Sequence, residues 1–378
     1  MSLHQGSFSG SRSMGSRLLR IQWPLVALLA VLAGVGLIAQ YSVAGGAFTP
    51  WADKHALRFV LTIGMILAVA LSPLHWWMNL ALPAYVAALL MLVLVPLIGT
   101  EALGARRWLS IAGMSFQPAE LMKVALVLML ARYYQWLGAS RVSRPQWVVL
   151  PLILIGMPVA LTLKQPDLGT AVLFAVVGFT LMFLAGVNLL YFVAGAAAAT
   201  TMAPLIWNRM HDYQRRRVEI FLDPEKDPLG AGYHITQSKI ALGSGGLSGK
   251  GFMQGTQSQL NFLPEKHTDF IFTTFAEEWG FSGAIGLIGL YVLIGMLVLW
   301  MAYCCRSQFG RLVTAGAGVV MFVYAFINVA MVMGLVPVVG VPLPLVSFGG
   351  TSMTTIMFGM AVAMCAYVNR TLGIRGGA

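Results

Sequence analysis

The chain has 378 residues, of which 58% are hydrophobic and only 10% are charged. Ordinary soluble domains are about 25% charged and about 45–50% apolar, so this composition excludes a soluble enzyme, a disordered chain and a collagen-like fibre. A single globular core could not bury so much apolar surface, because chains beyond about 250–300 residues usually divide into domains. Lipid is therefore the expected solvent for most of the chain.

Apolar runs of about 20 residues, the length that crosses the hydrocarbon of a bilayer, recur along the chain. In chain order the predicted spans are residues 21–43, 57–74, 77–98, 118–137, 147–164, 168–187, 189–207, 280–303, 312–335 and 351–368. The first run is longer than the apolar region of about 7–15 residues in a signal peptide, so we expect a retained span. We predict an all-α polytopic membrane protein of about ten transmembrane helices. It comprises a tail over 1–20, a ten-span domain over 21–370 and a tail over 371–378.

The charged residues sort by side once ten spans are assumed. The side that then holds both termini carries basic residues and no acid: Arg12, Arg17, Arg20, Arg132, Arg141, Arg144, Arg306, Arg311, Arg370 and Arg375. All 13 acids fall on the other side or at span ends that face it: Asp53, Glu101, Glu120, Asp167, Asp212, Glu219, Asp223, Glu225, Asp227, Glu265, Asp269, Glu277 and Glu278. The positive-inside rule then places both termini in the cytoplasm. This segregation explains the net charge of +11 by membrane orientation rather than by nucleic-acid binding.

The cysteines and histidines indicate neither disulfides nor a metal site. Cys304 and Cys305 fall in a predicted cytoplasmic loop and Cys365 in the last span, so none is placed to pair in an oxidising compartment. The six histidines form no H-E-x-x-H motif, and no zinc-ligand spacing occurs.

One external loop is long, covering residues 208–279 between the seventh and eighth spans. Loops of this length are usually functional or disordered, and this one lacks a disordered composition. Residues 213–222 alternate basic and apolar side chains at helical spacing, as an interfacial helix would. Residues 233–242 are predicted to form a second short helix that ends at Gly243.

The segment GSGGLSGKG follows this second helix and superficially resembles a phosphate-binding loop. Ser244 and Gly251 occupy positions where the P-loop pattern requires Gly and Ser or Thr, so the match fails twice. Two interpretations stay open: a glycine-rich nest whose N–H groups meet an anion, or a flexible turn.

Asp269 lies in PEKHTDF, where the long loop re-enters an apolar run, close to Lys266 and His267. Asp is a favoured helix N-cap, which is one interpretation. The other is a general base near the membrane surface, positioned by a loop. Spacing alone does not separate them.

Two other acidic positions resemble helix starts. Thr274-Phe-Ala-Glu277 fits a capping box, which would account for Glu277. Asp167, in KQPDLGTA before the sixth span, is suited to cap that helix, with Lys164 close by.

Glu120 and Lys123 follow Gln117-Pro118, where the proline suits the first turn of a helix. Their i,i+3 spacing places both side chains on one face. An ionisable group at mid-membrane costs roughly 2.5–3.5 kcal/mol and is functional by default. The pair forms either a self-satisfied ion pair or part of a polar cavity that faces the outer leaflet, where Lys123 meets an anionic head group.

Residues 337–352, PVVGVPLPLVSFGGTS, are apolar but interrupted by three prolines and three glycines. Irregular backbone at membrane depth must be buried in protein or line a wet cavity. We expect this segment to line the same outward-facing pocket as the acids.

Chemistry at the outer face cannot draw on cytoplasmic nucleotides, so a donor there must carry its own leaving group, as a lipid-linked pyrophosphate does. Glycosyl transfer from such a donor needs a base for the acceptor hydroxyl and positive charge for the departing pyrophosphate. Asp269 is the candidate base. The candidate cations are Lys54, Arg58, Lys123 and Lys164.

Long motifs then resemble a known family. QPAELMK, KQPDLGTA, HDYQRRRV, FLDPEKDPLGAGYHITQSKIALGSGGLSGKG, FLPEKHTDFIFTTFAEEWG and PVVGVPLPLVSFGGTS are similar to the SEDS family (shape, elongation, division and sporulation), nearest to its elongation branch. The motifs occur in order over about residues 20–370. The usual Q-P-S-E reads Gln117-Pro118-Ala119-Glu120 here, which removes one hydroxyl.

The resemblance implies a peptidoglycan glycosyltransferase that polymerises Lipid II into β-1,4 glycan strands and releases undecaprenyl pyrophosphate. It implies Asp269 as the essential, catalytic acidic residue of the large loop and Glu120, Lys123 and Asp167 as substrate-binding residues. We add Lys266, three residues before Asp269, to the substrate-binding set. The expected location is the bacterial inner membrane, with the active site facing the periplasm.

The family also implies a class B penicillin-binding transpeptidase and other proteins of the elongation machinery as partners. The acid-rich loop permits a divalent cation at the pyrophosphate but offers no recognisable cage, so no cofactor is assigned. Two rival hypotheses are a Lipid II flippase, which should carry ionisable groups across the membrane depth, and a non-catalytic scaffold for the transpeptidase.

Overall fold

The computed structural model describes residues 14–102, 105–111, 114–210, 212–227, 230–260, 262–263 and 265–373. These residues are mostly helical and include a small three-stranded sheet. Most of the predicted N-terminal tail and the end of the C-terminal tail, with Arg12 and Arg375, lie outside the described residues.

A helix lies at each of the predicted spans. The first half of the chain forms α1 Met14–Leu18, α2 Trp23–Val43, α3 Ala52–Ala70, α4 Leu74–Ile98, β1 Thr100–Ala102, β2 Ala105–Ile111, β3 Met114–Phe116, α5 Pro118–Leu137, η1 Ala139–Arg141, α6 Pro145–Lys164 and α7 Leu168–Leu184. The second half forms α8 Leu189–Arg209, α9 Asp212–Leu222, η2 Pro224–Lys226, α10 Ala231–Ser244, α11 Thr256–Gln259, α12 Ile271–Cys304, α13 Gln308–Val332 and α14 Gly350–Val368.

Six of the described helices, α2, α4, α6, α12, α13 and α14, are long and apolar enough to cross a membrane. The apolar helices Leu168–Leu184 and Leu189–Leu205, corresponding to α7 and most of α8, are shorter. The described chain is therefore a multi-pass helical membrane protein.

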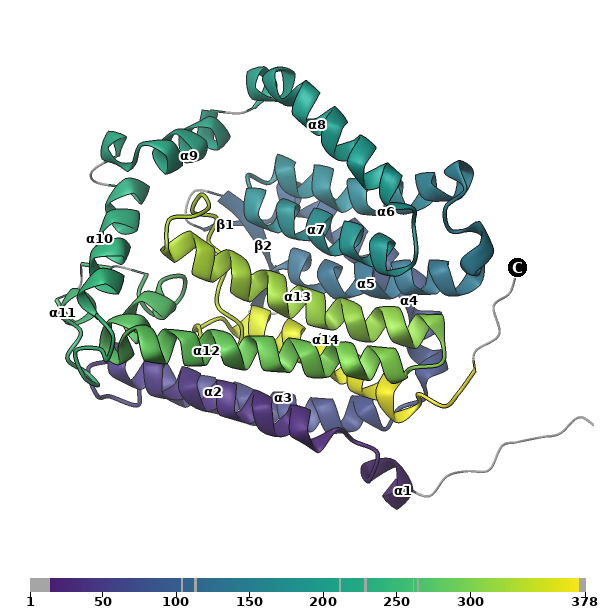
Figure 1. Cartoon of the computed structure of the whole chain (residues 1–378), viewed down its shortest axis with the longest axis horizontal. Helices are drawn as coiled ribbons and strands as arrows, with labels where there is room; N and C mark the ends of the chain where they lie inside the picture. Colours follow the sequence, from purple (N-terminus) through teal and green to yellow (C-terminus); the bar gives the residue numbers. More distant parts are fainter. Residues whose placement is uncertain are drawn as a thin grey trace, which may run out of the picture.

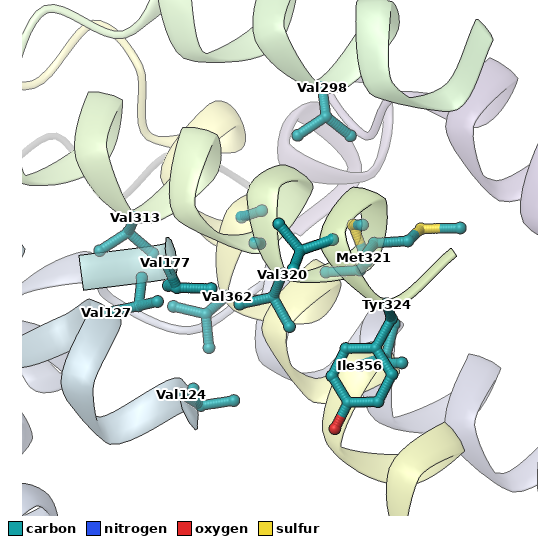
Figure 2. Close-up of a cluster of buried hydrophobic side chains, with 14 of the residues drawn as sticks. Val124, Val127, Val177, Val298, Val313, Val320, Met321, Tyr324, Ile356 and Val362 are labelled. Carbon is teal, nitrogen blue, oxygen red and sulfur yellow. The ribbon is translucent and has the colours of Figure 1, made fainter. Parts of the chain in front are cut away.

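The centre of the bundle is formed by α5, α13 and α14, whose side chains are largely buried. Figure 2 shows the core side chains that meet there, many of them branched. They come from five helices: Val124, Val127, Val177, Val298, Val313, Val320, Met321, Tyr324, Ile356 and Val362. Branched side chains have few rotamers to lose, so they pack densely between helices.

Contacts between helix ends define two ends of the bundle. At one end, Gln40 of α2 donates to the carbonyl of His267, and Asn328 of α13 donates to the carbonyl of Asp269. At the opposite end, the N–H of Phe309 donates to Gln135 of α5. Helices α5 and α13 thus run antiparallel, because Tyr324 near the end of α13 contacts Glu120 at the start of α5. The predicted acidic residues in the described contacts gather at the first end.

The sheet between α4 and α5 was not predicted. Its strands pair antiparallel in the order β1-β2-β3. Arg107 of β2 donates to the carbonyl of Pro166, just before α7. The sheet therefore contacts the end of the bundle that holds Asp167.

The long loop over residues 208–279, predicted to be external, folds into helices at its two predicted positions. The first is α9, and the second is α10, which continues one residue past Gly243. Figure 1 shows α8, α9 and α10 arching around the edge of the bundle towards the start of α12. The side chains of α8 are largely exposed over its second half.

The start of α12 also differs from the prediction. The eighth span was expected to begin at Gly280, whereas α12 begins at Ile271 and passes through a kink at Gly280, with φ 66° and ψ −166°. The φ value lies in the left-handed region that favours glycine.

Candidate functional site

Asp269 lies in the loop immediately before α12. The N-cap of α12 is Phe270, and no side chain caps that helix start. Among the described residues, no hydrogen bond reaches the Asp269 carboxylate. The structure therefore contradicts the N-cap interpretation and leaves the carboxylate free to accept a proton.

The irregular segment after α13 holds this loop in place. Asn328 Nδ2 donates to the Asp269 carbonyl at 2.8 Å and to the Val341 carbonyl at 2.7 Å. Ser347 Oγ donates to the Thr268 carbonyl at 2.6 Å. These bonds are made to backbone oxygens, so they fix the loop without occupying the carboxylate. Residues 337–352 therefore contact the loop that carries Asp269, and the outward-facing pocket that they were expected to line stays a prediction.

His267 anchors the same loop on the opposite side. Its ring stacks on Trp51, with centroids 4.8 Å apart. Its carbonyl accepts hydrogen bonds from the N–H of Phe348 at 2.9 Å and from Gln40 Nε2 at 3.0 Å. Helices α2 and α3 therefore share in positioning the segment that carries Asp269.

The partly buried carboxyl group of Asp269 is hard to ionise. Burial raises the pKa of Asp269 from its ordinary 3.8 to about 6, and the neighbouring carboxylate of Glu265 adds to the rise. The positive charge of Arg217 opposes it. A carboxylate with a pKa near the working pH is a better proton acceptor than an ordinary surface aspartate.

Arg217 is a site residue that the sequence did not reveal. It lies in α9, and its Nη1 donates to the Val338 carbonyl at 3.0 Å. Gly340, two residues after Val338, is so close to Asp269 that a Cβ there would be 3.3 Å from Oδ2. Three consecutive arginines in HDYQRRRV predicted an amphipathic helix but could not identify the one that faces the site.

Glu120 and Lys123 form a buried ion pair, with 2.6 Å between Lys123 Nζ and Glu120 Oε1. Their side chains are 9% and 2% exposed. Tyr324 Oη donates to Glu120 at 3.1 Å, and Lys123 Nζ lies 4.3 Å from the centre of the Tyr324 ring. The ion-pair interpretation is therefore confirmed. The Lys123 ammonium is held inside the protein rather than at an open surface.

Helix α13 connects this ion pair to the Asp269 loop. Tyr324 and Asn328 are four residues apart, so they lie on one face of α13, about 6 Å apart along the axis. Tyr324 contacts Glu120 and Asn328 contacts the Asp269 carbonyl. The two predicted sites are thus neighbours on a shared rigid element.

Asp167 is the N-cap of α7, as one interpretation predicted. Its carboxylate accepts from the backbone N–H of Thr170 at 3.2 Å and from Thr170 Oγ1 at 2.8 Å. Gln117 Nε2 donates to it at 3.3 Å, which joins it to the start of α5. A Cβ at Gly169 would lie 2.9 Å from Val339, so α7 packs closely on the irregular segment.

The other candidate cations differ in placement. Lys266 Nζ donates to the Ser258 carbonyl at 2.7 Å, and burial lowers the pKa of Lys266. Arg58 is partly buried, with its guanidinium 4.8 Å from the centre of the Phe348 ring. Lys54 and Lys164 are exposed.

The capping box predicted from Thr274 and Glu277 is wrong. The N-cap of α12 is Phe270, so both residues lie inside the helix, and both are fully buried. Glu277 accepts from Lys250 Nζ at 2.8 Å instead of from its own helix start. Local spacing cannot reveal a partner 27 residues away.

No group of three or more His, Cys, Asp or Glu side chains within the described parts of the chain could hold a metal ion.

Comparison with known proteins identifies the family. The FtsW/RodA/SpoVE family model, described as a cell cycle protein, matches residues 16–371. The chain belongs to this family. It is 44% identical over 317 residues to the peptidoglycan glycosyltransferase MrdB of Escherichia coli. The aligned region covers 82% of this chain and 85% of the relative. It is 38% identical over 283 residues to MrdB of Helicobacter pylori, covering 74% of this chain and 73% of that one.

Solved structures share the fold of this chain. A chain from a peptidoglycan synthase complex, described for its structural coordination of polymerization and crosslinking, superposes with a TM-score of 0.80 at 30% identity. The superposed region covers 93% of this chain and 98% of the solved chain. The rod shape determining protein RodA of Thermus thermophilus superposes with a TM-score of 0.70 at 27% identity and the same coverage. The SEDS resemblance, with its RodA-like branch, is therefore confirmed.

Proposed function

We infer that this chain is a peptidoglycan glycosyltransferase of cell-wall elongation and rod shape, the activity and role for which its relatives are named. We propose that it polymerises Lipid II and that Asp269 is the general base. One observation carries this proposal: a partly buried carboxylate with a raised pKa, held through its backbone and free of hydrogen bonds among the described residues.

In the proposed reaction, Asp269 takes the proton of the C4 hydroxyl of the acceptor sugar. The oxygen attacks the anomeric carbon of the donor from the face opposite the pyrophosphate, and the bond to the pyrophosphate breaks. Inversion at this carbon gives the β-1,4 link, and undecaprenyl pyrophosphate leaves. A positioned base typically contributes about 10²–10⁴-fold to such a step.

Cations near Asp269 are suited to the departing pyrophosphate. Arg217 acts on Asp269 electrostatically, and Arg58 and Lys266 lie on segments that contact the same loop. Arginine binds phosphate oxygens through paired donors, whereas lysine acts as a point charge. Three charged residues are assigned to shaping the substrate pocket rather than to binding the pyrophosphate directly: Glu120, Lys123 and Asp167. Their charges are already paired or hydrogen-bonded within the protein.

An apolar pocket on the outside of α5 suits the prenyl chain. It lies between α4, α5 and α14, and its lining includes Leu80, Leu121, Val124 and Phe358. Leu121 and Val124 are the chain neighbours of Glu120 and Lys123. Leu80 and Leu121 are exposed, as side chains facing lipid should be.

We place both termini in the cytoplasm and the Asp269 end of the ten-span bundle in the periplasm, as the positive-inside rule predicts. The loop over 208–279 is then periplasmic. The match to a chain of a synthase complex supports a class B penicillin-binding transpeptidase as partner.

A divalent cation at the pyrophosphate stays a prediction. With no cluster of three acidic, His or Cys side chains among the described residues, the ion would take most ligands from phosphate oxygens and water, as Mg²⁺ commonly does. Polymerisation measured in EDTA, with and without added Mg²⁺, tests this.

The central experiment compares wild type with Asp269→Asn, both purified with the transpeptidase partner. Glycan formed from labelled Lipid II in detergent is resolved on a gel. We expect the variant to fold normally and to lose at least about 100-fold in rate, because the amide cannot accept the proton.

The same assay separates the rivals. Polymer formed in detergent requires no flipping, so it contradicts a function limited to Lipid II transport. A non-catalytic scaffold would tolerate Asp269→Asn, and full activity of that variant would end the general-base proposal.

A further inference from the structure

Glu277 is fully buried next to the entry to α12, and its carboxylate is surrounded by donors. Oε1 accepts from Lys250 Nζ at 2.8 Å, from Thr256 Oγ1 at 3.2 Å and from the N–H of Gln257 at 3.0 Å. Oε2 accepts from the N–H of Ser258 at 3.4 Å. A buried charge with this many partners is fixed in position, because removing any donor leaves it uncompensated.

Three of these donors belong to the start of α11, a single turn. The first N–H groups of a helix have no partner within it, and a carboxylate commonly satisfies them. Here the carboxylate comes from α12 rather than from the residue before the turn. Glu277 therefore attaches α11 to the helix that follows Asp269.

The α11 turn in turn holds the catalytic loop. The Ser258 carbonyl accepts from Lys266 Nζ at 2.7 Å, and Lys266 lies three residues before Asp269. Gln259 Nε2 donates to the Ser42 carbonyl at 3.2 Å, which ties α11 to α2 as well. A continuous path of hydrogen bonds thus runs from Glu277 to the segment that presents Asp269.

The glycine-rich segment serves this arrangement. The N–H of Lys250 donates to the Glu277 carbonyl at 3.1 Å, and the N–H of Gly251 donates to the Glu278 carbonyl at 3.0 Å. The N–H of Gly249 donates to the Gly245 carbonyl at 2.8 Å. These N–H groups are bonded within the protein, so they do not form an anion-binding nest. They bring Lys250 alongside Glu277.

We propose that Glu277 and Lys250 are positioning residues for glycosyl transfer. Their ion pair holds α11, and α11 holds Lys266 and the loop that orients Asp269. Neither side chain touches the reacting atoms. The inference rests on the proposed role of Asp269 and adds a second layer of residues on which the rate depends.

The test uses the full chain with its transpeptidase partner and labelled Lipid II. The variants are Glu277→Gln, Lys250→Met, Lys250→Arg and the double variant Lys250→Met/Glu277→Gln. We expect each of Glu277→Gln and Lys250→Met to lower kcat about ten-fold or more, with KM for Lipid II changed less than about two-fold. Lys250→Arg should restore at least about half of the wild-type kcat, since it keeps the charge.

Two further readouts separate positioning from a general loss of structure. The double variant should be no slower than the slower single variant, because both changes break the same contact. The acid limb of the pH–rate profile should move in the single variants, as the Asp269 environment changes. Lys250→Met leaves the charge of the fully buried Glu277 uncompensated, whereas the double variant removes both charges, so the double variant provides folded protein even where Lys250→Met does not.

Asp223→Asn is the matched control, since Asp223 and Lys226 form an exposed pair 3.6 Å apart in the same external loop. It should leave kcat unchanged. The inference is overturned if folded Glu277→Gln or folded Lys250→Met keeps the kcat and the pH profile of the wild type. It is also overturned if the loss of rate only follows the amount of folded protein. If wild type itself makes no glycan, the proposed function fails instead.

Discussion

The pKa of Asp269, raised by burial to about 6, sets the pH range in which the proposed base is ionised. Only the ionised carboxylate accepts a proton, so kcat/KM for polymerisation should fall about ten-fold per pH unit below pH 6. An ordinary aspartate would give this decline only below about pH 4. Initial rates of glycan formation between pH 5 and 8 provide the measurement. A rate that stays constant down to pH 5 contradicts Asp269 as the base.

The buried pair of Glu120 and Lys123 gives a prediction about stability. Lys123→Met leaves Glu120 buried and uncompensated, which should cost about 3–5 kcal/mol. The double variant Glu120→Gln/Lys123→Met removes both charges and should regain most of that loss. Unfolding midpoints of the purified protein in detergent test this. Equal midpoints for the single and double variants would show that the pair is not coupled.

At the scale of elements, the glycine-rich segment packs closely on the backbone of α12 at its kink. Gly249 has φ +82°, and a Cβ there would overlap the Glu278 carbonyl. Gly246 has φ +57° but faces open space. Gly246→Ala should therefore cost only the conformational penalty of about 1 kcal/mol, and Gly249→Ala distinctly more. Thermal unfolding of the two variants checks the order, and equal losses would contradict the close packing.

Helices were the predictable elements of this protein. A run of about 20 apolar residues has few options in lipid other than a helix, so each predicted span coincides with one. The strands between α4 and α5 escaped prediction because three to seven residues of mixed polarity carry little periodic signal. The start of α12 was placed late, because its first turns pack on the loop rather than on lipid.

The site was predictable residue by residue but not as an arrangement. The ion pair of Glu120 and Lys123 followed from i,i+3 spacing, and the cap at Asp167 from its place before a helix. The contacts of Arg217 and Glu277 did not follow, because both depend on partners far along the chain. A local motif such as the capping box competes with such partners, and at Glu277 the distant ones prevail.

At the scale of the whole molecule, the charge segregation and the contacts at the two ends of the bundle favour one topology. In it both termini lie on one side of the membrane and Asp269 lies on the other. Asp269 lies at the end where acids gather, and at the other end the backbone N–H of Arg306 donates to the carbonyl of Arg370. A bundle with ten crossings returns both termini to one side, so we expect the basic end and the Asp269 end to lie across the membrane from each other.

This topology predicts which positions are reachable from outside the cell membrane. In a background with Cys304, Cys305 and Cys365 replaced by Ser, single cysteines are introduced as Glu225→Cys in the long loop and Arg144→Cys between α5 and α6. Both positions are exposed, so neither folding nor burial should block their reaction. A membrane-impermeant maleimide added to spheroplasts should label Glu225→Cys at once and Arg144→Cys only after permeabilisation. Labelling of Arg144→Cys in intact spheroplasts would mean that the number of crossings is wrong, and that the periplasmic placement of Asp269 must be revised with it.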